Sequence, residues 1–161
     1  MRKAMYPGTF NPITNGHLDV VRKSSKVFDE VIVAVASYTG KLTMIDFDER
    51  YRLCVESVSS FPNVKVVKFK GLTVEFAREI GAQTMIRGLR AVSDFEYELS
   101  LAMMNMKLSG GMDTVFFLPD QKYLYLSSTM IRQVAELGGA VSDLVPVCVE
   151  KYLKKYYQKK D

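Results

Sequence analysis

Short runs of β-branched and other apolar residues alternate along this chain with longer stretches in which apolar residues recur at helical spacing. The short runs predict strands at residues 3–6, 31–36, 64–69, 84–87 and 114–118. The longer stretches predict helices at residues 17–27, 47–59, 73–80, 94–108, 128–137 and 147–157. We therefore expect an α/β protein, Rossmann-like and doubly wound, whose five-stranded, mainly parallel sheet carries helices on both faces.

The 161 residues contain no linker, repeat or low-complexity segment, which predicts a single domain over 1–161 with a C-terminal helix at about 146–158. A hydrophobic content of 48% is enough for a core without disulfides. Cys54 and Cys148 have apolar neighbours and no metal-ligand spacing, so we expect both to be reduced core residues. We also expect the methionines at 103, 104 and 106 to fill gaps in the packing.

Charge and hydropathy limit the partners of the protein. A net charge of +4, from 22 basic and 18 acidic residues, suits anionic ligands such as phosphorylated metabolites. No apolar run approaches the roughly 20 residues of a membrane span, and the first five residues lack the apolar stretch of a signal peptide. The basic and aromatic residues at 151–160 fit a solvated terminal helix better than an RNA contact. We expect a cytoplasmic protein with no membrane or nucleic-acid partner.

The candidate ligand site lies at the carboxyl ends of the strands, because the loops of a doubly wound sheet converge there. Glycines, hydroxyls and cations suited to phosphate follow the predicted strands at 8–10, 41, 71–73, 87–90 and 123–129. His17 is the only histidine, and it stands beside Gly16 at a predicted helix start, where free N–H groups attract anions. The alternative for His17 is a half-buried residue that caps the helix.

Other phosphate-binding and hydrolytic motifs are excluded by their spacing. The segment 40–43 resembles the end of a P-loop, but Val35 stands where that motif needs glycine, and Leu42 where it needs serine or threonine. No G-x-G-x-x-G follows the first strand, and Ser127 and Ser128 lack the G-x-S-x-G setting of a hydrolase. No residues are spaced as metal ligands.

Three segments carry a family resemblance. Thr14-Asn15-Gly16-His17 resembles the (T/H)-x-G-H motif of nucleotidyltransferases, and residues 127–132 resemble their S-S-(S/T)-x-x-(R/K) motif. Residues 86–98 then resemble bacterial phosphopantetheine adenylyltransferases in particular. The similarity to that family extends over nearly the whole chain. The chain departs from the family pattern in three places. Asn11 stands where the family usually has aspartate, and Thr129 stands where it usually has a third serine. The loop 37–46 is also divergent.

The resemblance implies an enzyme that transfers the adenylyl group of ATP to 4′-phosphopantetheine, giving dephospho-coenzyme A and pyrophosphate. It implies an ATP site formed by Thr9, Phe10, His17, Gly88, Leu89, Arg90, Glu98, Tyr123, Leu124, Tyr125, Leu126, Ser127, Ser128 and Thr129. It implies that the acceptor contacts Thr9, Lys41, Thr73, Arg87, Leu101 and Asn105. The implied catalytic residues are His17, Lys41 and Arg90.

Further implications are Mg²⁺ bound mainly through the ATP phosphates, a homohexamer, and feedback inhibition by coenzyme A. Because a phosphate acceptor is already anionic, the chemistry needs positioning and charge stabilisation rather than a general base. Two alternatives stay open. One is a related nucleotidyltransferase acting on nicotinate mononucleotide or glycerol phosphate, and the other is a non-catalytic nucleotide-binding module. Lys41 also has a simpler interpretation as a solvated surface residue.

Overall fold

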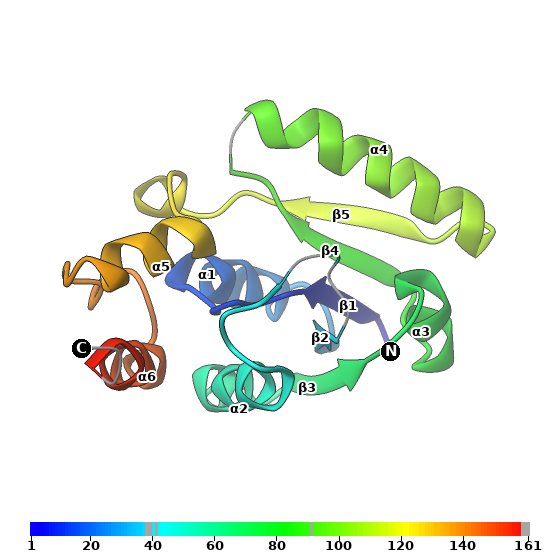
Figure 1. Ribbon diagram of the computed structural model, residues 1–161. Coiled ribbons are helices and arrows are strands. Elements are labelled where there is room, and N and C mark those ends of the chain that lie inside the picture. Colours follow the sequence, from blue (N-terminus) through cyan, green and yellow to red (C-terminus); the bar gives the residue numbers. More distant parts are fainter. Residues whose placement is uncertain (38–39, 41, 91, 159–161) are drawn as a thin grey trace.

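A parallel five-stranded sheet forms the centre of the computed structural model, which describes residues 1–37, 40, 42–90 and 92–158 (Figure 1). The strands are β1 Lys3–Gly8, β2 Glu30–Ala36, β3 Val64–Phe69, β4 Thr84–Gly88 and β5 Asp113–Phe117. Their order across the sheet is β3-β2-β1-β4-β5, and every neighbouring pair is parallel. The direction of winding therefore reverses between β1 and β4, which is where such sheets bind ligands.

Helices cover both faces of this sheet, as the sequence predicts. The helices are α1 Asn15–Ser24, α2 Phe47–Val58, α3 Thr73–Glu79, α4 Val92–Ser109, α5 Ser128–Glu136 and α6 Val147–Gln158. Side chains alternate along β1, so that Ala4 and Tyr6 pack with α1 and α2 while Met5 packs with α3 on the opposite face. The predicted α/β fold class is confirmed.

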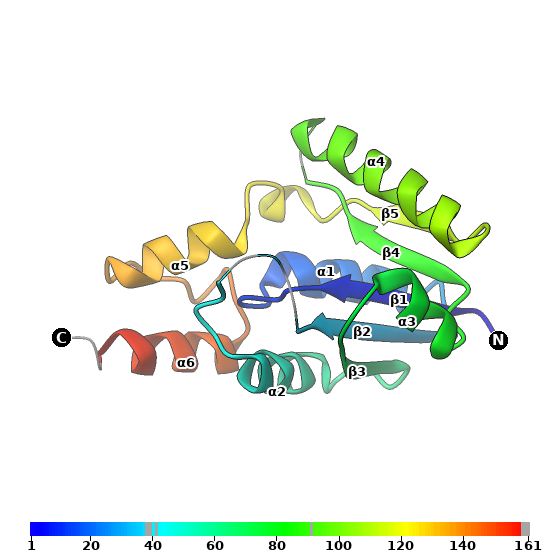
Figure 2. The same cartoon turned by 45° about the vertical axis from the view of Figure 1, so that its right-hand side comes forward.

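The last two helices lie together at the end of the molecule away from the N-terminus (Figures 1 and 2). α6 contacts both α2 and α5, and its buried residues Val149 and Leu153 belong to the larger of the two core clusters. The Tyr157 hydroxyl donates to the Arg132 carbonyl of α5 at 3.2 Å. The C-terminal helix is therefore part of the same packed unit as the sheet.

The element boundaries differ little from those predicted. α1 begins at Asn15, two residues earlier than expected, because Thr14 caps it. A short 3₁₀ helix at Gln121–Tyr123 was not predicted. Within the part of the chain that the structure describes, no helix is long and apolar enough to cross a membrane.

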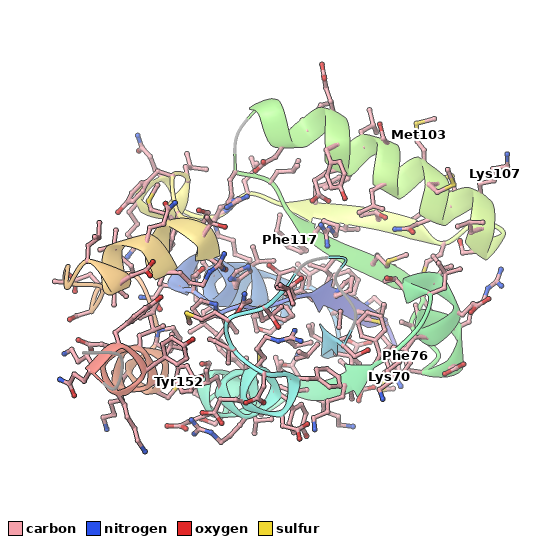
Figure 3. All side chains as sticks on the ribbon, in the orientation of Figure 1. Lys70, Phe76, Met103, Lys107, Phe117 and Tyr152 are labelled. Atoms are coloured by element: carbon pink, nitrogen blue, oxygen red, sulfur yellow. The ribbon has the colours of Figure 1, made fainter. Side chains whose placement is uncertain are left out.

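One packing expectation is wrong, and a second, on the cysteines, is confirmed only in part. Met103 is 64% exposed and points outward from α4 (Figure 3), and Met104 and Met106 are also exposed, because this helix lies at the β5 edge of the sheet with apolar residues on every side. Cys54 is buried, but Cys148 is only half-buried on α6, where its sulfur lies 3.3 Å from the Ser57 hydroxyl.

Candidate active site

A cleft of about 580 Å³ opens where the sheet changes its winding direction. Its walls come from the loop after β1, the start of α1, the end of β4, α4 and the start of α5. Of the predicted site residues, those that line it are Thr9, Phe10, His17, Thr73, Arg87, Gly88, Arg90, Glu98, Leu101, Asn105, Leu126, Ser127, Ser128 and Thr129. The fold therefore gathers most of the predicted site, from segments more than a hundred residues apart, around one cavity.

Four of the predicted residues that the structure describes are not among those lining the cleft. Leu89 donates its N–H to the Phe117 carbonyl at 3.0 Å, which extends the ladder between β4 and β5. Tyr123 is the last residue of the 3₁₀ helix, and Leu124 and Tyr125 follow it with 37% and 58% of their surfaces exposed. Lys41 lies outside the described residues, so its role stays a prediction.

His17 caps α1 and presents one defined ring nitrogen to the cleft. Its Nδ1 accepts from the Thr14 backbone N–H at 3.0 Å, while the Thr14 hydroxyl accepts from the His17 N–H, so the pair forms a capping box. A neutral ring that accepts at Nδ1 carries its proton on Nε2. Burial lowers the pKa of His17 to about 4, and the charges of Arg90 and Arg87 act in the same direction. At neutral pH, His17 is therefore an uncharged hydrogen-bond donor.

Arg87 is held rigidly at the end of β4. Its Nε and Nη2 donate to the two carboxylate oxygens of Glu98, each at 2.6 Å, and its Nη1 donates to the Pro7 carbonyl at 3.2 Å. Burial alone would lower the pKa of Arg87, but the hydrogen bonds and charge of Glu98 outweigh it and raise the pKa. The residues 87 and 98, predicted for different ligands, thus form one ion pair.

Two further arginines approach the cleft from its α5 side. Arg90 donates from Nη1 to the Leu126 carbonyl at 2.8 Å and from Nε to Asp94 at 3.2 Å. Arg132 donates from Nη1 to the Asn11 carbonyl at 2.5 Å. Among the lining residues that the structure describes, Glu98 is the only carboxylate. The cleft is therefore rich in positive charge.

The N-terminus of α5 adds hydrogen-bond donors to the same wall. Ser127 caps this helix by accepting from the Met130 N–H at 3.1 Å, and the Ser128 hydroxyl donates to the Pro12 carbonyl at 2.7 Å. α1 and α5 thus both present their N-termini to the cleft, and each N-terminus carries a partial positive charge. This arrangement suits a ligand with several phosphate groups.

The opposite side of the cleft is formed by α3 and α4. Thr73 is the first residue of α3, and Leu101 and Asn105 lie one turn apart on α4. Asn105 is buried and its amide approaches the Met85 sulfur at 3.8 Å. This half of the cavity is less charged and suits an extended, partly apolar ligand.

Among the polar residues of the cleft wall that sequence reasoning left out of the site are Asn11 and Arg132. Asn11 is buried, and its Oδ1 accepts from the Ile45 N–H at 3.1 Å, so it fixes the loop before α2. Arg132 is the last residue of the S-S-T-x-x-R motif, and its place in that motif was the signal that could have added it to the site.

A smaller hollow of about 460 Å³ lies between α2 and α6. Its charged side chains pair with one another, such as Arg52 with Glu49 at 2.6 Å.

Comparison with known proteins defines the class of protein to which this site belongs. A family model described as cytidylyltransferase-like matches residues 5–134. A crystal structure from Vibrio parahaemolyticus, described as a nicotinate-nucleotide adenylyltransferase, superposes with a TM-score of 0.76. It covers 98% of this chain and 97% of its own at 21% identity, which establishes the fold alone. The match over most of the chain makes it a member of the cytidylyltransferase-like family, and the fold agrees.

Curated relatives narrow the class. A protein of Desulforudis audaxviator is 48% identical over 154 residues, which cover 96% of this chain and 94% of the relative. A protein of Moorella thermoacetica is also 48% identical, over 157 residues and 98% of each chain. Both are named phosphopantetheine adenylyltransferase. This chain belongs to the phosphopantetheine adenylyltransferase family.

Proposed function

We propose that this enzyme transfers the adenylyl group of ATP to 4′-phosphopantetheine and releases dephospho-coenzyme A and pyrophosphate. The observation that carries the proposal is the convergence of His17, Arg87, Arg90 and the N-termini of α1 and α5 on one cleft. The choice of 4′-phosphopantetheine as the acceptor rests on the names of relatives that are 48% identical to this chain. The next-best candidate, another phosphate acceptor, has support only from a structure that is 21% identical.

Catalysis follows from the charges of the cleft. The phosphate of the acceptor attacks the α-phosphorus of ATP directly, and because that phosphate is already anionic, no side chain has to remove a proton. The Nε2–H of His17 donates to the α-phosphate oxygen on which charge develops, and Arg90 faces the charge of the leaving pyrophosphate. Arg87, held by Glu98, orients the attacking phosphate, and Lys41 is assigned to it by resemblance alone.

Mg²⁺ is proposed to enter with ATP and to reduce the repulsion between its phosphates. The described residues contain no cluster of three or more histidine, cysteine, aspartate or glutamate side chains, and the Glu98 carboxylate is occupied by Arg87. Mg²⁺ commonly keeps water and substrate phosphates as ligands, so these residues fit a metal held mainly by ATP.

We further propose a homohexamer located in the cytoplasm and inhibited by coenzyme A in the same cleft. The exposed apolar residues of α4, among them Phe95, Leu99 and Met103, support burial of this helix between subunits. Coenzyme A contains the adenylyl and pantetheine parts of the product, so it would occupy both halves of the cavity. Sedimentation of the purified protein tests the hexamer, and competition between coenzyme A and 4′-phosphopantetheine tests the inhibition.

The reaction itself is tested by pyrophosphate release with Mg²⁺ and ATP. 4′-phosphopantetheine, nicotinate mononucleotide and glycerol phosphate are offered in parallel. Release with 4′-phosphopantetheine alone, and a product with the mass of dephospho-coenzyme A, supports the proposal. Pyrophosphate release with another acceptor overturns the assignment of 4′-phosphopantetheine. ATP binding without pyrophosphate release in the presence of any of the three acceptors favours a non-catalytic nucleotide-binding module.

A further inference from the structure

A buried arginine that takes no part in the mechanism above lies beneath the first loop of the cleft. Arg50 of α2 is 1% exposed. Its Nη1 donates to the Thr9 carbonyl at 2.6 Å and to the Ala36 carbonyl at 2.9 Å, and its Nε donates to the Ile45 carbonyl at 3.2 Å. Within the described part of the chain, its hydrogen bonds go to backbone carbonyls and none goes to a carboxylate.

Such a residue is costly to the folded state. A buried cation without a carboxylate partner loses its hydration, and burial accordingly lowers the pKa of Arg50. Carbonyl dipoles, the negative charge of Asp46 and the ring of Phe47, 5.4 Å from the guanidinium carbon, compensate only in part. An apolar side chain of the same size would fill this volume without that cost. The fork of N–H donors on the Arg50 guanidinium is therefore the feature that needs an explanation.

The three carbonyls belong to three segments that meet at the cleft. Thr9 follows β1, Ala36 ends β2, and Ile45 precedes α2. Thr9 and Ala36 also line the cleft. One side chain thus ties together the carboxyl ends of two neighbouring strands and the segment that leads back to its own helix.

The bond to Thr9 also fixes the direction of the next N–H group. The peptide bond between Thr9 and Phe10 is trans, so its N–H points away from its carbonyl, and therefore away from Arg50. Phe10 has φ of 49°, a left-handed conformation that costs a non-glycine residue free energy. Within the described part of the chain, the Phe10 N–H has no acceptor, although Phe10 itself is buried in the cleft wall.

We propose that Arg50 is a positioning residue that holds the peptide between Thr9 and Phe10 in this orientation, so that the Phe10 N–H meets a phosphate of the nucleotide. This inference rests on the proposed function. Arg50 touches no substrate; it keeps the first loop in a strained conformation before ATP arrives, so that the loop does not have to be ordered during the reaction.

The test compares Arg50→Met and Arg50→Lys with the wild-type enzyme. Methionine keeps much of the apolar stem without the fork, and lysine keeps the charge but cannot reproduce the planar arrangement of donors. We expect kcat to fall about 100-fold in Arg50→Met and at least about 10-fold in Arg50→Lys, because a misplacement near 1 Å has this effect on rate. We expect KM for both substrates to change less than about threefold, which a general loosening of the cleft would not produce.

Arg52, two residues along the same helix, supplies the matched control. It is half exposed and pairs with Glu49 and Glu56 on the surface, so Arg52→Met should leave kcat unchanged. Circular dichroism and urea unfolding establish that each variant is folded at the assay temperature.

Three results would overturn the inference. They are a normal kcat in folded Arg50→Met or Arg50→Lys, a rise in KM alone, and failure of both variants to fold, which would make Arg50 a purely stabilising residue. An inactive wild-type enzyme with 4′-phosphopantetheine would instead overturn the proposed function. If another acceptor supports the wild-type reaction, the same comparison of kcat and KM is made with that acceptor.

Discussion

His17 performs two separable tasks, and a pair of substitutions can divide them. Its Nδ1 accepts from the Thr14 N–H at 3.0 Å, and its Nε2–H is the donor assigned to the phosphate. In His17→Asn, the amide oxygen can replace Nδ1 as the cap, but no group reaches the position of Nε2. In His17→Gln, the terminal amide reaches that position and retains a donor, while the cap is lost. Each variant therefore removes one task.

The expected magnitudes follow from the two hydrogen bonds. Loss of one preorganised donor to a developing oxyanion lowers kcat by about 10² to 10³, or roughly 3–4 kcal/mol, so His17→Asn should show this loss with nearly wild-type stability. Loss of the acceptor for the Thr14 N–H should lower the free energy of unfolding by about 1 kcal/mol in His17→Gln. Its kcat should stay within about tenfold of wild type.

The assay is pyrophosphate release at saturating substrates between pH 6 and 8, with urea unfolding of the same samples. Because the pKa of His17 is lowered to about 4, its ring stays neutral over this range, and we expect no inflection from it in kcat. An unchanged kcat in His17→Asn would refute the donor role. An inflection near pH 6.5 that disappears in His17→Gln would refute the neutral ring.

Three further predictions concern the supports of the site. Glu98→Gln should lower the free energy of unfolding by about 3 kcal/mol in urea, because it leaves the largely buried Arg87 without its carboxylate. Burial raises the pKa of Asp19, but hydrogen bonds from two basic side chains and a backbone N–H outweigh it and lower the pKa. The resulting stability is present above the ordinary pKa near 3.9 and lost as pH falls below it, so Asp19→Asn should cost about 2 kcal/mol at pH 7 and flatten acid unfolding. Gly8→Ala would place a Cβ 2.8 Å from the Phe10 ring and displace the first loop, and pyrophosphate release should show kcat lowered about tenfold.

The sequence was most informative where local pattern determines structure. The run 31–36 is wholly apolar, as a parallel strand buried on both faces requires, and β2 begins only one residue earlier, at Glu30. Thr14 and Ser127 cap α1 and α5, and the motifs that contain them gave His17 and residues 127–129 of the cleft wall. Family resemblance supplied the rest of the assignments, and the roles of individual residues stay predictions until they are measured.

Tertiary contacts limited what the sequence could reveal. Arg50 lies among acidic and basic neighbours in a helix and has the local pattern of an exposed residue, yet three distant carbonyls bury it. Arg87 at the end of β4 pairs with Glu98 on α4, eleven residues further along the chain. Neither the hydrophobic periodicity nor a sequence motif specifies this pair. The exposed Met103 shows the opposite error, because apolar residues on all sides of a helix do not tell which of them the same chain will cover.

The sheet also separates the residues assigned to ATP from those assigned to the acceptor, and this separation affects how the specificity of such enzymes can change. The residues assigned to ATP lie mainly with α1 and α5 on one side, and Thr73, Leu101 and Asn105 lie with α3 and α4 on the other. We therefore expect substitutions on α3 and α4 to alter acceptor preference while the nucleotide half keeps its sequence. On this layout, evolution or an engineer could fit a new acceptor pocket to an unchanged adenylyl donor site.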